Sequence, residues 1–82
     1  MLTNEQIQFG IKSLENSIIS HKEEIESWKK CILNDLQSPN LDEYTISSIE
    51  SRLKKIQKLM VEIEVAAGKI RVIKEILNTS VL

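Results

Sequence analysis

Apolar residues recur along this 82-residue chain at alternating spacings of three and four, in two long runs separated by its only proline, Pro39. This spacing is the seam of a coiled-coil heptad, in which apolar side chains form one stripe of an α-helix. A proline removes a backbone donor, clashes with the preceding helical turn and pushes the residue before it towards extended geometry. We therefore expect an all-α fold, with two long helices joined by a turn near Gln37 to Asn40.

A helix-capping signal precedes the first run. Thr3 and Gln6 form a capping-box arrangement that predicts a helix starting at Asn4. The expected seam covers almost four heptads: Ile7, Ile11, Leu14, Ile18, His21, Ile25, Trp28 and Ile32. A flanking apolar set widens this face: Phe9, Ile19, Leu33 and Leu36. A wider face is typical of a helix with more than one neighbour, which favours a bundle.

The second run follows Asn40 and Asp42, either of which can cap a helix. Its expected seam is Ile46, Ile49, Leu53, Ile56, Met60, Ile63, Ala67 and Ile70. Because Lys74 occupies the next seam position, the apolar residues move to Ile73, Ile76 and Leu77, which predicts a register slip and an exposed patch. The chain is thus one domain, 1–82, with helices over about 4–37 and 42–78 and a turn at 38–41.

Two such helices, each about 50 Å long, must lie antiparallel as a coiled-coil-like hairpin. Folding at 38–41 sets side by side residues whose numbers sum to about 79. The rule places an acidic cluster at the level of a basic one: Glu23, Glu24 and Glu26 beside Arg52, Lys54, Lys55 and Lys58. It also places Glu5 opposite Lys74, and Lys29 opposite Glu50.

Composition excludes several classes of function. The net charge of -1 argues against a polyanion as the main partner, so nucleic-acid binding is not expected. A single cysteine, Cys31, with no apolar signal region, predicts an intracellular, cytoplasmic protein. No run approaches the roughly 20 apolar residues that cross a membrane, so no membrane partner is expected.

The reactive side chains do not form a catalytic or metal-binding pattern, so we expect no enzyme activity, metal or cofactor. His21, the only histidine, occupies a seam position and is predicted to set the register of the helices, with a pH-sensitive interface as the alternative. Cys31 is expected to be a partly buried apolar residue; activation of its thiol by Lys29 and Lys30 is the alternative.

Both helices carry small residues at the same height along the hairpin. Under the folding rule, Gly10 lies level with Ala66, Ala67 and Gly68. Small residues allow a close approach of helices or leave a slot for a partner's side chain, and Phe9 is the obvious filler of such a space. The predicted partner-binding and oligomer residues are Phe9, Gly10, Ile19, Trp28, Leu33, Leu36, Ala67, Gly68, Ile73, Ile76 and Leu77.

In a single pair of helices the flanking apolar residues remain exposed to water, so we expect another chain to cover them. A second copy related by a two-fold axis would give a four-helix bundle, and a different protein is the alternative. The leading hypothesis is a non-enzymatic module that binds and modulates or sequesters a partner protein, in the class of small regulatory proteins encoded by phages or mobile elements. An oligomeric scaffold component is the first alternative. Nucleic-acid binding through Arg52 to Lys58 is the second.

Overall fold

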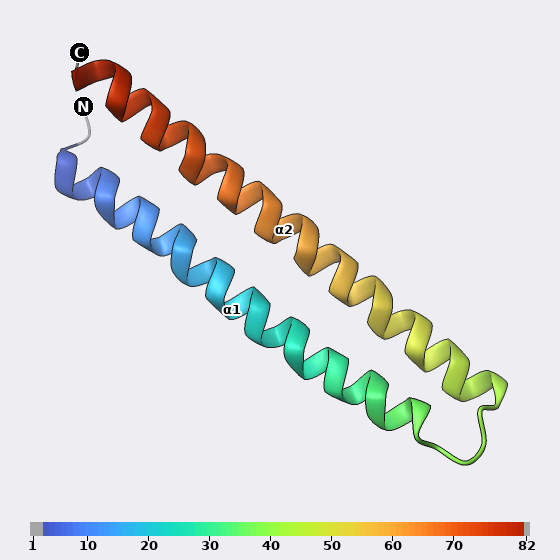
Figure 1. Cartoon of the computed structure of the whole chain (residues 1–82). Helices are drawn as coiled ribbons and strands as arrows, with labels where there is room; N and C mark the ends of the chain where they lie inside the picture. Colours follow the sequence, from blue (N-terminus) through green and yellow to red (C-terminus); the bar gives the residue numbers. More distant parts are fainter. Residues whose placement is uncertain (1–2, 82) are drawn as a thin grey trace.

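A computed structural model describes residues 3–81 of the chain. Two helices account for nearly all of this range: α1, Asn4–Leu36, and α2, Glu43–Val81. They lie side by side and antiparallel, with the loop at one end and both termini at the other (Figure 1). The predicted all-helical hairpin is therefore confirmed.

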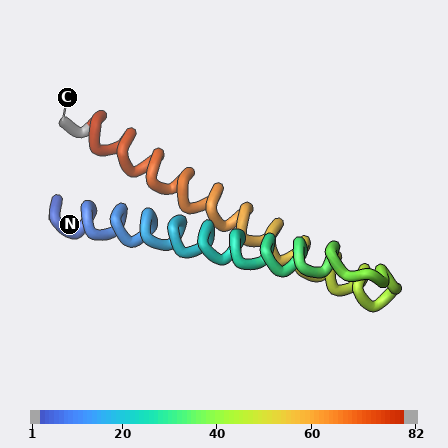
Figure 2. Tube along the Cα trace, turned by 60° about the horizontal axis from the view of Figure 1, so that its bottom comes forward, coloured from blue at the N-terminus to red at the C-terminus, as the bar shows by residue number. Residues whose placement is uncertain are grey.

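The hairpin is a thin rod. Its extents are 62 × 17 × 15 Å, and its radius of gyration is 18.6 Å. A compact domain of this length would have a radius of gyration of about 12 Å. The two helices cross at a shallow angle, as the rotated view in Figure 2 shows. A rod this thin has room for a single seam between the helices and no wider core.

The start of α1 follows from its capping box, as predicted. The Thr3 amide donates to Gln6 Oε1 at 2.8 Å, and the Gln6 amide donates to Thr3 Oγ1 at 3.2 Å. At the other end the helix stops at Leu36, one residue before the expected end. The Gln37 amide still donates to the carbonyls of Leu33 and Asn34, at 3.2 and 3.3 Å, so Gln37 caps the helix two residues before Pro39.

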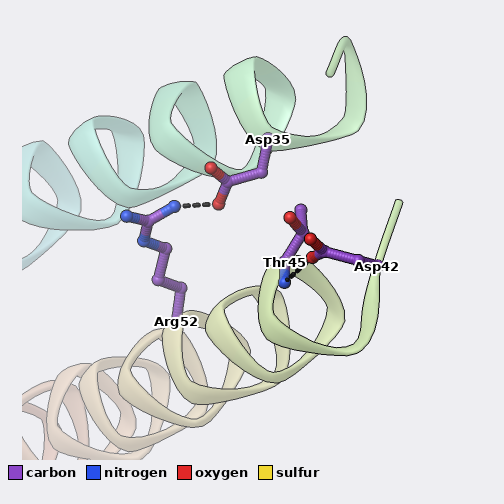
Figure 3. Close-up of polar contacts among 4 residues, drawn as sticks. All are labelled: Asp35, Asp42, Thr45 and Arg52. Carbon is purple, nitrogen blue, oxygen red and sulfur yellow. Dashed lines mark hydrogen bonds and ion pairs between the residues drawn. The ribbon is translucent and has the colours of Figure 1, made fainter. Parts of the chain in front are cut away.

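Asp42, rather than Asn40, caps α2. The Thr45 amide donates to Asp42 Oδ1 at 2.8 Å, the contact drawn in Figure 3. That amide, followed by the Thr45 hydroxyl, holds the pKa of the Asp42 carboxyl below its ordinary value. Both groups stabilise the ionised form, because the charged carboxylate is the better hydrogen-bond acceptor. The turn therefore extends from Gln37 to Asp42, slightly longer than the predicted 38–41.

The C-terminal end of α2 lies beyond the predicted one. The sequence suggested an end near Asn78, but the helix continues to Val81, and Leu82 lies outside the described residues. The Thr79 hydroxyl donates to the Glu75 carbonyl at 2.9 Å. This bond satisfies the side chain within the helix, so Thr79 does not compete for the backbone as a helix-ending residue would.

The core consists of one seam between the helices. All eight predicted seam residues of α1 are buried or partly buried. Ile25, Ile56 and Leu59 form the central cluster, against which three further residues pack: Trp28, Ile32 and Ile63. Towards the termini, Ile11 and Ala66 are also buried. The predicted seam of α1 is thus confirmed.

The predicted seam of α2 is wrong in one of its two stripes. Ile46, Leu53 and Met60 are 46%, 47% and 53% exposed. The positions that point inward form an uninterrupted heptad pattern: Thr45, Ile49, Arg52, Ile56, Leu59, Ile63, Ala66, Ile70, Ile73 and Leu77. Because Ile73 and Leu77 continue this pattern, no register slip occurs at Lys74.

Arg52 points inward at the level where Leu53 was predicted to lie in the seam because Leu53 is apolar. Its guanidinium pairs with the carboxylate of Asp35 on α1, and both side chains are partly buried (Figure 3). Asp35 itself continues the α1 seam, three residues after Ile32. A charged residue can occupy a seam when a partner of opposite charge and a hydrogen bond satisfy it. The polar pair therefore settles the rotation of α2 about its axis.

The facing register also differs from the prediction. Lys55 lies over the Trp28 ring. The folding rule instead places Ser51 beside Trp28, so the observed register is shifted by about one helical turn. Lys29 bonds Glu26 on its own helix at 3.2 Å instead of Glu50. Within residues 3–81, no ion pair joins Glu5 to Lys74 or the acidic cluster to the basic one. The antiparallel direction was right, but the charge pairs inferred from it were not.

A pair of substitutions tests the phase of α2. Leu59 is 8% exposed and Val61 is 58% exposed, two residues away. Leu59→Ala should lower the free energy of unfolding by about 2 to 4 kcal/mol, because it removes core contacts and leaves a void. Val61→Ala should change it by less than about 0.5 kcal/mol. Urea unfolding followed by circular dichroism measures both, and equal effects would contradict the observed seam.

The cap on α2 predicts a pH dependence. Because the pKa of folded Asp42 lies below the ordinary value of 3.8, the group contributes stability above that pH and loses it as the pH falls further. Asn caps a helix about as well as Asp but does not titrate. Asp42→Asn should therefore reduce the fall in melting temperature below pH 3.8. An acid-induced fall as steep as that of the unsubstituted protein would rule out this role.

Candidate interaction surfaces

The hairpin exposes more surface than a compact protein of its mass. Its accessible surface is 6742 Å², against about 5,000 Å² for a typical folded monomer of 9.4 kDa. Among the described residues, more large apolar side chains are exposed than buried, and none is fully buried. Such a surface is typical of a chain that folds against other molecules.

One side of the hairpin carries most of the exposed apolar residues near the loop. We call this set the apolar face: Leu33, Leu36, Ile46, Leu53 and Met60. Met60 shares a groove with Lys22 and Lys29 of α1, which shows that these three side chains lie on one side. Leu36 and Leu53 stand one heptad from Lys29 and Met60, so both extend the same side towards the loop.

Charged residues flank the apolar face in an ordered way. On α1, Lys22 and Lys29 continue the stripe of Leu36 towards the termini. On α2, Glu50 and Glu64 lie beside the stripe of Leu53 and Met60, three and four residues from them. All four are exposed. Beside the apolar face the α1 edge is therefore basic, apart from Glu26, which bonds Lys29, and the α2 edge is acidic. One heptad nearer the open end the signs reverse, with Glu15 on α1 and Arg71 on α2.

The opposite side is a polar groove. His21 Nε2 lies 3.4 Å from Glu62 Oε2, and the Lys55 ammonium lies 4.4 Å from the centre of the Trp28 ring. The remaining lining residues are Ser20, Glu24, Lys58 and Leu59. Polar contacts between the helices thus dominate this side, whereas the apolar face dominates the other.

The basic stretch Arg52 to Lys58 does not form one free surface. Arg52 is turned into the seam against Asp35, and Lys55 covers Trp28. Lys54 and Lys58 are exposed, but they lie on different sides of the helix from Arg52. Phosphate binding needs several cations directed at one backbone, an arrangement this stretch does not present.

The two glycines do not serve a close approach of the helices, and the slot for a partner's side chain stays a prediction. A Cβ atom built on Gly10 or Gly68 would meet nothing within 4 Å, so neither glycine is needed for a close approach of the helices. Phe9 does not fill a gap between them, because it is 75% exposed and points outward. Both glycines lie off the observed seam, and this explains why their small size has no packing role here.

The predicted patch near the C-terminus is also corrected. Ile73 and Leu77 are partly buried in the seam, and only Ile76 of the three is exposed. Two valines that the sequence analysis passed over, Val65 and Val72, are exposed beside Ile76. Their spacing of seven and four places them on one side of α2. That spacing is the sequence pattern from which this patch could have been predicted. We call these three residues the open-end patch.

The other predicted contact residues divide between seam and surface. Trp28 packs on the central cluster, and Ala67 is partly buried beside the seam. Leu33 and Leu36 belong to the apolar face, and exposed Ile19 lies on the same side, three residues before Lys22. Of this group, only the exposed three are available to another chain.

Cys31 lies at the surface, so the expectation that it is partly buried is wrong. The heptad position of Cys31 lies on the side of the polar groove, one heptad after Glu24. His21, by contrast, is partly buried and contacts Glu62, a geometry that suits a register-setting residue.

Within residues 3–81, no group of three or more His, Cys, Asp or Glu residues could hold a metal ion. No helix in that range has the length and apolarity to cross a membrane. No protein-family model, curated protein or solved structure matches the chain. The exposed surfaces are therefore the features of the structure that bear on function.

The reactivity of Cys31 tests whether the polar-groove side of the hairpin is exposed to solvent. A thiol-specific chromogenic reagent should modify native Cys31 about as fast as the urea-unfolded protein, because nothing covers it. A control variant with Cys31→Ser and Leu59→Cys should react far more slowly when folded, since position 59 is buried. Slow reaction of native Cys31 would show that another chain covers the groove side.

Proposed function

We propose that this protein is a non-enzymatic protein–protein interaction module, a helical hairpin that self-associates and binds a partner protein in order to modulate or sequester it. The observation that carries the proposal is the apolar face, whose five exposed side chains come from both helices and lie on one side of the hairpin. Isolated exposed apolar residues are common on proteins, but a contiguous set along two packed helices is typical of an interface.

The polar side chains support a structural role rather than a chemical one. His21 contacts Glu62, Arg52 pairs with Asp35, and Lys55 lies on Trp28. Each of these contacts joins α1 to α2, so each fixes how the helices meet. An interaction module needs this, because its binding surfaces depend on a rigid arrangement of the two helices.

We further propose a cytoplasmic protein whose self-association gives a four-helix bundle. Exposed Cys31 suits a reducing compartment, where a surface thiol persists without forming disulfides. The excess of about 1,700 Å² of surface over a compact monomer exceeds the roughly 800 Å² that each partner buries in an interface of standard size.

A scaffold component is the second candidate, favoured by one observation. The apolar face and the open-end patch lie in different halves of α2. If one copy's face bound another copy's patch, the contact would be heterologous and could extend without closing.

Sedimentation over a wide range of concentrations separates the candidates. The module should reach the mass of two chains and remain there, whereas a scaffold should continue to grow. Leu53→Ser with Met60→Ser should shift the protein to the mass of one chain. Tyr44→Ser changes an exposed residue near the loop on the polar-groove side of α2; it is the control and should leave the mass unchanged. A monomer at every concentration contradicts self-association.

The partner-binding half of the proposal has its own test. We assign the partner to the open-end patch, since self-association through the apolar face leaves it free. Immobilised protein should retain a specific protein from an extract of the native host, and Val72→Ser with Ile76→Ser should abolish that retention. The Leu53→Ser, Met60→Ser variant is the comparator and should still capture it. Equal capture by all variants would rule out the patch.

A further inference from the structure

The apolar face lies exposed in the single chain. We infer that its occupant is a second copy of this chain, related by a two-fold axis parallel to the helices, so that α1 of each copy lies on α2 of the other with both loops at the same end. This inference rests on the proposed self-association and adds the face, the orientation and the residues that set it.

The position and composition of the face favour a second copy. Its five apolar residues come from both helices, so a copy presents the same set in return. A two-fold interface requires this self-complementarity, since each patch must meet itself. The other side is a poor alternative, because covering it would desolvate Glu24, Lys58 and the His21–Glu62 contact.

The flanking charges choose between the two possible axes. An axis parallel to the helices sets the basic α1 edge of one copy against the acidic α2 edge of the other. An axis perpendicular to them sets α1 on α1 and α2 on α2, so the Lys22 and Lys29 edges face each other, as do the Glu50 and Glu64 edges. Opposed like charges destabilise an interface, so the parallel axis is favoured.

The levels of these charges along the rod also agree with a parallel axis, which keeps each residue at its own level. Glu62 contacts His21, so Glu64 lies within about one helical turn of Lys22. Lys55 lies over Trp28, so Glu50 lies little more than one turn from Lys29. Both distances are within reach of a lysine and a glutamate side chain that extend towards each other.

Distances between spin labels test the orientation. In a Cys31→Ser background, Asn40→Cys labels the loop and Glu75→Cys labels the open end, both at exposed positions off the face. A parallel axis predicts label separations below about 40 Å at both sites, because the copies lie one helix diameter apart at every level. A perpendicular axis places the two open ends more than about 50 Å apart, the length of a helix.

The outcomes distinguish this inference from the proposed function. Short distances at both positions support it. A dimer by mass with widely separated open ends overturns the orientation alone and leaves self-association standing. A monomer by mass, without dipolar coupling, overturns both. A dimer unaffected by Leu53→Ser with Met60→Ser overturns the choice of face.

Charge reversal supplies an independent test. Lys22→Glu with Lys29→Glu should raise the dimer dissociation constant about tenfold, because acidic edges then meet acidic edges. Adding Glu50→Lys and Glu64→Lys to the same chain should restore it. Lys54→Glu with Lys58→Glu changes the net charge equally at positions off the face and is the matched control. No weakening by the first pair, or no restoration by the second, overturns the parallel axis.

Discussion

Burial of one apolar seam is the interaction on which the rest of this structure depends. Ile25, Ile56 and Leu59 meet at its centre, and within residues 3–81 neither helix has another helix or strand to pack against. Long helices gain most of their stability from such tertiary packing, so the seam holds both α1 and α2 in place. A core this thin also explains why so much apolar surface stays outside it, which is the origin of the interaction surfaces.

Polar contacts between the helices give the seam its register. Apolar side chains of similar size tolerate sliding by a turn, but an ion pair in the seam does not, since displacement would leave two partly buried charges unpaired. Asp35 and Arg52 supply that constraint near the loop, and His21 with Glu62 supplies a weaker one in the middle. The capped turn at Asp42 completes the alignment, because it defines where α2 begins.

The two sides of the hairpin differ because α2 carries apolar residues at two adjacent heptad positions. One set points into the seam, and the other, Ile46, Leu53 and Met60, forms half of the apolar face. The opposite side, the polar groove, is bridged by contacts such as Lys55 on Trp28. This division connects the packing to the proposed function: one side holds the hairpin together, and the other is available to a second chain.

Much of the fold could be predicted from the sequence, because local chemistry decides it. The capping box at Thr3, the break before Pro39 and the heptad run of α1 determined two helices, their direction and one face. The rotation of α2 could not be predicted, since its two neighbouring apolar stripes have the same periodicity. Nothing in the sequence indicated that Arg52 would point inward, because its partner Asp35 lies on the other helix. For the same reason the predicted exposed patch of Ile73 and Leu77 was wrong. The sequence by itself determined which residues could be buried, and only the meeting of the two helices decided which of them were.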